Sequence, residues 1–206
     1  MPSHYKVKTA GMRKYFMIAI VAAGVVLTLS CIKSNRSVEL KTDEAKAAFE
    51  HLNKVRANPD AYSKEIGANL KKVKKQPALV WNDILAQVAE EKAMDMARND
   101  YMDHKNKKGE GINIMIHRAG YELPESWIDK KSNNYFESIQ AGTTSGVMMI
   151  NDLILDEYDR DLGHRKHLLG MDDWNAGLVD CGIGMAYNPN SRYRMYSCVI
   201  IAKHNY

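Results

Sequence analysis

The sequence predicts an α+β domain in which helices cover a small antiparallel sheet. Between residues 42 and 169 most apolar residues recur at helical spacing, and one short β-like run interrupts them. The chain then closes with two β-like runs joined by a turn. The whole chain of 206 residues is 45% hydrophobic and 26% charged, which is the balance of a globular domain able to bury a core.

The first 31 residues predict an export signal. Arg13 and Lys14 precede an apolar run over 15–29, which ends at Ser30 and Cys31. At about 15 residues this run is shorter than the roughly 20 that a membrane-spanning helix needs. A basic segment, a short apolar core and a small residue at the cut are typical of a secretory signal. Met12 is an alternative start of this signal.

The end of the apolar run, Thr-Leu-Ser-Cys at 28–31, also resembles a bacterial lipobox, in which the cysteine becomes the lipidated N-terminus. We therefore expect a signal over 1–31, lipidation of Cys31, a polar tether over 32–41 and a folded domain over 42–206. The expected location is the bacterial cell envelope, on the extracytoplasmic side, with the lipid holding the protein to a membrane. A plain cleaved signal, which would give a secreted protein, and an uncleaved anchor are the alternatives.

The distribution of charge argues against a nucleic-acid partner. The formal net charge is +4, but four of the 29 basic residues precede Cys31 and no acidic residue does. The processed chain therefore carries 25 basic residues against 25 acidic ones. A neutral chain offers no general attraction to nucleic acid or to an anionic lipid surface.

The first half of the domain predicts three helices. One begins at Thr42, a candidate N-cap with acidic residues in the first turn, and ends before Pro59. Pro59 starts a second, short helix that stops near Gly67. A third helix, capped by Asn82, runs to about Met102 and places His104 just beyond its C-terminus.

The second half predicts a short helix between Gly109 and Gly120, a strand over 134–139 that carries Glu137, and a helix over 146–155 with Asp152 near its end. The terminal hairpin pairs 178–187 with 193–203. If Asn188 lies opposite Tyr193, Cys181 comes within about two residues of Cys198, as a cross-strand disulfide needs. An exported chain favours that disulfide, and two buried free thiols are the alternative.

Four ordered stretches resemble the bacterial branch of the CAP superfamily, the cysteine-rich secretory, antigen 5 and pathogenesis-related proteins that share the SCP domain. The likeness covers nearly all of residues 42–204 and continues through Gly-Ile-Gly at 182–184. The stretches are Leu-Asn-Lys-Val-Arg-Ala-Asn-Pro at 52–59, Leu-Val-Trp-Asn at 79–82 with Ala-Arg-Asn-Asp-Tyr-Met-Asp-His at 97–104, Arg-Ala-Gly-Tyr at 118–121, and Gly-His-Arg-Lys-His-Leu-Leu at 163–169.

The resemblance implies an α-β-α sandwich with a cavity lined by two histidines and two acidic residues. The histidines fall on His104 and His164, and the first acid falls on Glu137, in Glu-Ser-Ile-Gln where the family usually has Glu-Asn-Ile/Leu-Ala. The second acid is assigned to Asp152, with Asp156 or Glu157 as alternatives. His167, three residues after His164, is interpreted as a partly exposed surface residue, and His51, His117 and His204 as structural.

Two imidazoles, each oriented by a carboxylate, would present their remaining nitrogens to the cavity. His104 and His164 could then bind zinc or another divalent metal weakly, or act as a general acid and base. No nucleophile motif accompanies them. The leading hypothesis is a binding module for a lipid or sterol-like molecule, a cell-wall fragment or a host factor. A metal-assisted, peptidase-like hydrolase and a structural envelope protein are the alternatives.

Overall fold

The computed structural model describes residues 37–203, so Cys31, the predicted signal, half of the predicted tether and His204 lie outside the described residues. The described helices are α1 (Thr42–Ala57), α2 (Ser63–Ile66), α3 (Asp83–Asn99), α4 (Ile112–Arg118), α5 (Gly146–Leu155), α6 (Gly163–Leu169) and α7 (Asp173–Ala176), with 3-10 turns at Pro59–Tyr62 and Glu125–Trp127. The strands are β1 (Glu39–Leu40), β2 (Val80–Trp81), β3 (Glu137–Ala141), β4 (Asp180–Tyr187) and β5 (Met195–Ala202). None of these helices is both long enough and apolar enough to cross a bilayer.

The sheet is built on the terminal hairpin. Its order is β1-β4-β5-β3, with antiparallel neighbours throughout, and the short β2 runs parallel to one end of β4. Strand β3 therefore lies at one edge of the sheet. β1 lies in the segment that the sequence assigns to a polar tether. Its residues Glu39 and Leu40 pair with Tyr187 and Ala186 of β4, so they are part of the sheet.

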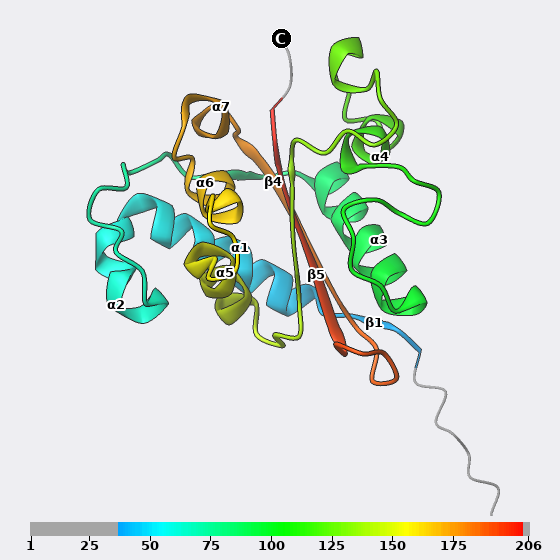
Figure 1. The fold of residues 1–206 in the computed structure, drawn as a ribbon, viewed down its shortest axis with the longest axis horizontal. Coiled ribbons are helices and arrows are strands. Elements are labelled where there is room, and N and C mark those ends of the chain that lie inside the picture. The colour runs from blue at the N-terminus through cyan, green and yellow to red at the C-terminus, as the bar shows by residue number, and fades with distance from the viewer. Residues whose placement is uncertain (1–36, 204–206) are drawn as a thin grey trace, which may run out of the picture. The chain divides into compact units, whose positions relative to one another are not determined.

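Helices cover both faces of this sheet, as the expected α-β-α sandwich requires (Figure 1). Helix α3 packs on one face, against β4 and β5, and α1 packs on the other, beside α5 and α6. Gly182 and Gly184 of β4 lie under α3 so closely that an added Cβ at either position would stand 2.1 or 2.2 Å from a backbone nitrogen of that helix. The glycines therefore allow the α3 backbone to contact the sheet directly.

Local signals explain where the helices begin and end. The side chain of Asn82 accepts hydrogen bonds from the N–H groups of Ile84 and Leu85, as its N-cap role predicts. Ser145 caps α5 in the same manner, and Gly67 ends α2 in the left-handed conformation. At the start of α1 the capping position belongs to Lys41, one residue before the expected Thr42, and it makes no side-chain cap.

The hairpin register differs by one residue from the expected pairing. Asn188 pairs through its N–H with the carbonyl of Arg194, not with Tyr193, and Arg194 has a left-handed φ of 64°. Cys181 therefore lies opposite Ile201, and Cys198 lies opposite Gly184. Because a shift of one residue reverses the face of every side chain, the two cysteines point to opposite faces of the sheet. Both are buried free thiols, and the expected disulfide is absent from the described residues.

Candidate functional site

The edge strand β3 lies between the two halves of the site. Glu137 lies opposite Ile200 of β5, which lies opposite Gly182 of β4. Residues that lie opposite each other share a face of the sheet, and Gly182 lies under α3. The side chain of Glu137 therefore points to the face covered by α3. The next residue, Ser138, points to the opposite face, where its hydroxyl lies 2.8 Å from Nδ1 of His167 in α6. One short strand thus carries side chains into both helical layers.

His104 belongs to the half of the site on the α3 side. Its Nδ1 lies 2.8 Å from Oε2 of Glu137, whose side chain is fully buried, while the imidazole is 44% exposed. The thiol of Cys198 donates to the other carboxylate oxygen at 3.5 Å. The structure therefore brings together the first predicted pair of histidine and acid.

A buried lysine holds the loop that carries His104. Lys92 of α3 has no exposed surface, and its ammonium donates to the carbonyl of Asp103 at 2.6 Å. The same ammonium lies 5.5 Å from the centre of the Tyr101 ring. Sequence reasoning did not identify Lys92, which lies beside the buried residues Ala89, Ala93 and Met96 of α3; its contact with the loop is seen only in the structure.

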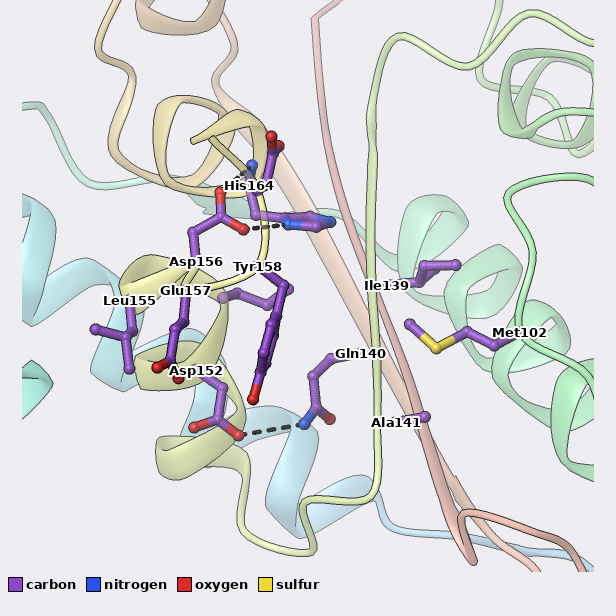
Figure 2. Close-up of a pocket in the computed structure, with 12 residues that line it drawn as sticks. Met102, Ile139, Gln140, Ala141, Asp152, Leu155, Asp156, Glu157, Tyr158 and His164 are labelled. Carbon is purple, nitrogen blue, oxygen red and sulfur yellow. Dashed lines mark hydrogen bonds and ion pairs between the residues drawn. The ribbon is translucent and has the colours of Figure 1, made fainter. Parts of the chain in front are cut away.

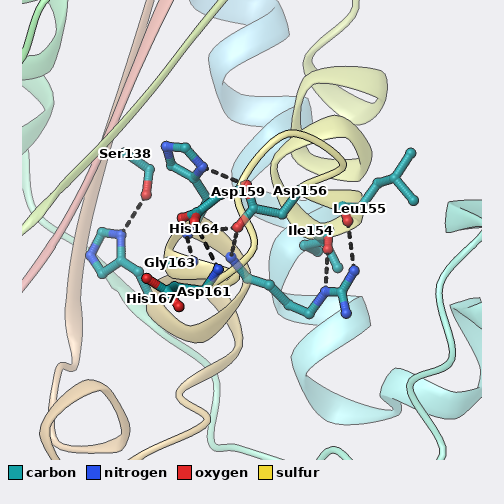
Figure 3. Close-up of polar contacts among 10 residues, drawn as sticks. Ser138, Ile154, Leu155, Asp156, Asp159, Asp161, Gly163, His164 and His167 are labelled. Atoms are coloured by element: carbon teal, nitrogen blue, oxygen red, sulfur yellow. Dashed lines mark hydrogen bonds and ion pairs between the residues drawn. The ribbon is translucent and has the colours of Figure 1, made fainter.

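His164 belongs to the half of the site on the α5 and α6 side, and the acid beside it is Asp156. Its Nδ1 lies 2.7 Å from Oδ1 of Asp156, and this carboxylate is nearly buried, whereas the imidazole is 29% exposed (Figure 3). The other oxygen of Asp156 accepts the backbone N–H groups of His164 and Arg165.

The assignment of Asp152 as the second acid is therefore corrected. Asp152 lies one turn earlier in α5, where its carboxylate accepts from the amide of Gln140 and the hydroxyl of Thr143. The reason is that α5 ends at Leu155, and Asp156 then takes a left-handed φ of 51° that turns the chain toward α6. Glu157, the other alternative, is exposed and has no side-chain hydrogen bond among the described residues.

Three further contacts hold α6 against the rest of the fold. The guanidinium of Arg165 donates to the carbonyls of Ile154 and Leu155 at the end of α5. The buried Arg56 of α1 donates to the carbonyl of Leu168 at 2.7 Å. His167 is buried against β3 and β5, so its expected position on the surface is wrong. Burial lowers the pKa of His167 to about 4.

A pocket of about 570 Å³ opens along β3, beside His164 (Figure 2). Figure 2 places Met102 on one side of β3 and Tyr158 and His164 on the other. His104 does not line this pocket, although Met102 of the same loop does. The pocket is lined by Met102, Ile139, Gln140, Ala141, Asp152, Leu153, Leu155, Asp156, Glu157, Tyr158, Asp159 and His164. Met102, Gln140 and Tyr158 are lining residues that sequence patterns alone could not identify.

One set of residues, made of two aspartates and His164 itself, has the composition of a cation site. Among the described residues, Asp156, Asp159 and His164 are the one set of three whose ligand atoms lie within 4.8 Å of one another. The two carboxylates already have a structural role, because Asp159 accepts the N–H groups of Asp161 and Gly163 as Asp156 accepts those of His164 and Arg165. Those hydrogen bonds lower the pKa of Asp159. We therefore interpret this set as the cap of α6.

The two histidines share one arrangement. Each directs Nδ1 to a buried carboxylate, and neither Nε2 has a hydrogen bond among the described residues. A carboxylate on one ring nitrogen is the usual outer partner of a metal-bound histidine, so each imidazole by itself has the arrangement of a metal ligand. Without a metal, the same nitrogens could accept or donate a hydrogen bond to a ligand.

The family assignment follows from comparison with known proteins. The model of the cysteine-rich secretory protein family, CAP, matches residues 49–200, which is well over half of the chain. The chain therefore belongs to the CAP family, as its sequence motifs predict. A search of curated proteins finds no match.

Two solved structures are similar in fold. One is an extracellular protein containing an SCP domain from Bacillus anthracis str. Ames, with a TM-score of 0.51 and 20% identity over 79% of this chain and 41% of that one. The other is an outer surface protein from Borrelia burgdorferi, with a TM-score of 0.51 and 16% identity over 79% of this chain and 94% of that one. This chain thus spans less than half of the Bacillus protein, and at these identities the likeness concerns the fold.

Proposed function

We propose that this CAP protein is an extracytoplasmic, lipid-anchored binding protein whose pocket along β3 takes a ligand beside His164, with His104 held by Glu137 of the same strand. The observation that carries the proposal is that two histidines from opposite helical layers each rest on a buried carboxylate and keep Nε2 available. Export is supported by the signal-like residues 1–31, and by two structural relatives whose names call them extracellular and outer surface proteins.

The same two histidines would hold a divalent metal such as zinc. Two protein ligands make a weak and open site, so we expect exchangeable binding. A bound metal would supply a positive charge able to attract an anionic or carbonyl oxygen of the ligand. Glu137 and Asp156 would keep each imidazole in the tautomer that leaves Nε2 unprotonated.

The test is a thermal melt with and without zinc. Zinc should raise the melting temperature of the native protein, because a ligand that binds only the folded state stabilises it. The double variant His104→Ala, His164→Ala should lose the shift, whereas His117→Ala, which removes a histidine bound to the N–H of Leu123, should keep it. An equal zinc response in the native protein and the double variant would contradict the metal site.

The anchor is tested separately. Replacement of Cys31 by serine removes the only thiol that could accept the lipid at the predicted cleavage site. The variant should move from the membrane fraction to the soluble fraction of the producing cells. If the variant still partitions into the detergent phase, lipidation of Cys31 is wrong.

A further inference from the structure

The outer edge of β3 has unpaired backbone groups. Two residues that flank β3 show which of its backbone groups face β5. The N–H of Gly142 donates to the carbonyl of Met195, and the carbonyl of Phe136 accepts from the N–H of Ile201. The even-numbered residues of β3 therefore point their backbone groups at β5. In an antiparallel pair the alternate residues point away from the partner strand. The N–H and C=O groups of Glu137, Ile139 and Ala141 therefore face outward, and they have no hydrogen-bond partner among the described residues.

This unpaired edge faces the pocket. Ile139, Gln140 and Ala141 form one wall of it. Unpaired edge strands are the positions at which an extended peptide can add to a sheet, with its backbone supplying the hydrogen bonds. The edge of β3 spans five residues, which suits a short peptide segment.

The pocket is also acidic. Four carboxylates line it, those of Asp152, Asp156, Glu157 and Asp159, and no lysine or arginine does. Arg165, the cation nearest in the chain to His164, directs its guanidinium to carbonyls of α5. Asp156 and Asp159 have both oxygens engaged by α6 or by the loop just before it, but Glu157 and one oxygen of Asp152 have no hydrogen bond among the described residues. These two residues can therefore accept hydrogen bonds from a cation.

Apolar side chains complete the walls. Tyr158 is 97% exposed and Met102 is 43% exposed, although both line the pocket. An exposed tyrosine ring next to carboxylates suits a cationic side chain with an aliphatic stem, because the ring attracts the cation and the stem covers apolar surface.

We propose that the pocket binds an extended peptide that pairs with the outer edge of β3 and places a lysine or arginine side chain between Asp152, Glu157 and Tyr158. The inference rests on the proposed binding function of this pocket and names the class of its ligand. Backbone pairing would supply affinity for any extended peptide, and the carboxylates would select the basic side chain.

The probe is a fluorescein-labelled heptapeptide, Thr-Val-Thr-Lys-Thr-Val-Thr, blocked at its C-terminus and measured by fluorescence anisotropy in buffer containing a metal chelator. The full chain should bind it about tenfold more tightly than the same peptide with acetylated lysine. In the double variant Asp152→Asn, Glu157→Gln the two peptides should bind alike. The matched variant Glu50→Gln, Glu122→Gln makes the same charge change at exposed positions outside the pocket lining and should keep the preference.

Backbone pairing has its own variant and its own probe. Ala141→Pro removes only an outward N–H, and proline is tolerated at that position of an edge strand. Binding should fall at least about fivefold, and a probe N-methylated at alternate residues should lose affinity for the native protein by a similar factor. The melting temperature of Ala141→Pro shows whether the variant is folded, and the N-methylated probe tests pairing independently of that variant.

Several results would overturn the inference. Equal affinity for the lysine and acetyl-lysine peptides would show that the pocket does not select a cationic side chain. Cadaverine, a free diamine, should compete only weakly; if it displaces the probe as well as unlabelled peptide does, the site binds amines and not peptides. If no peptide binds while zinc still stabilises the native protein through His104 and His164, the peptide inference fails and the proposed function stands. Loss of both responses would reject both.

Discussion

At the scale of single residues, His167 makes the stability of the protein depend on pH. Its imidazole is buried between Ser138 and the carbonyl of Ile201, and burial lowers its pKa from 6.5 to about 4. Below pH 6.5 the unfolded chain binds a proton that the folded chain excludes. The free energy of unfolding should therefore fall as the pH drops from 6.5 to 4, by about 3 kcal/mol in total.

Urea unfolding at several pH values measures this effect. His167→Gln keeps a polar side chain but cannot titrate, so its free energy of unfolding should depend less on pH across this range than that of the native protein. The comparison of slopes remains valid even if the variant is less stable at every pH. An unchanged slope would assign the effect to another group.

The residue scale also shows where sequence reasoning is strong and where it stops. Glu137 and His104 could be paired because both fall inside motifs of the CAP family, and the structure has them in contact. The second acid could not be fixed in the same manner, because Asp152 lies near the end of an apolar helix, Asp156 and Glu157 follow it directly, and the sequence does not show which of the three carboxylates turns toward His164. The left-handed turn at Asp156 decides among them, and a non-glycine residue in that conformation leaves no clear sequence signal.

At the scale of elements, Asp156 couples helix α6 to the site, and this role can be separated from that of Asp152. Asp156→Ala removes an acceptor for two N–H groups of α6 as well as the partner of His164. It should lower the free energy of unfolding by about 2 kcal/mol. Asp152→Ala removes only exposed contacts with Gln140 and Thr143 and should cost about 0.5 kcal/mol.

Zinc binding supplies a second measurement for the same pair of variants. Asp156→Ala should weaken the zinc response, because His164 loses the carboxylate that orients its ring. Asp152→Ala should keep most of it. If Asp152→Ala proves the more harmful change in both assays, the carboxylate that supports His164 is not the one the geometry indicates.

The elements themselves were largely predictable, since apolar spacing, Asn82, Pro59 and the glycine-ended turns give their limits. The register of the hairpin was not predictable. A loop residue with positive φ, Arg194, moves the pairing by one position, and that single step places Cys181 and Cys198 on opposite faces of the sheet. Composition and turn residues cannot detect such a step, although the whole disulfide expectation depended on it.

At the scale of the whole molecule, the sandwich depends on how closely α3 lies against β4. Gly182 faces the backbone of Leu85 and Ala86, and a Cβ there would come within 2.1 Å of the Ala86 nitrogen. Gly182→Ala should therefore push α3 away from the sheet and lower the free energy of unfolding by about 3 kcal/mol. Because α3 leads into the loop of His104, the zinc response should weaken as well.

Gly177→Ala is the matched control, since its added Cβ meets no atom closer than 3.4 Å and its φ is −80°. Urea unfolding of the two variants should differ clearly, and equal stabilities would mean that the contact between α3 and β4 can relax without cost.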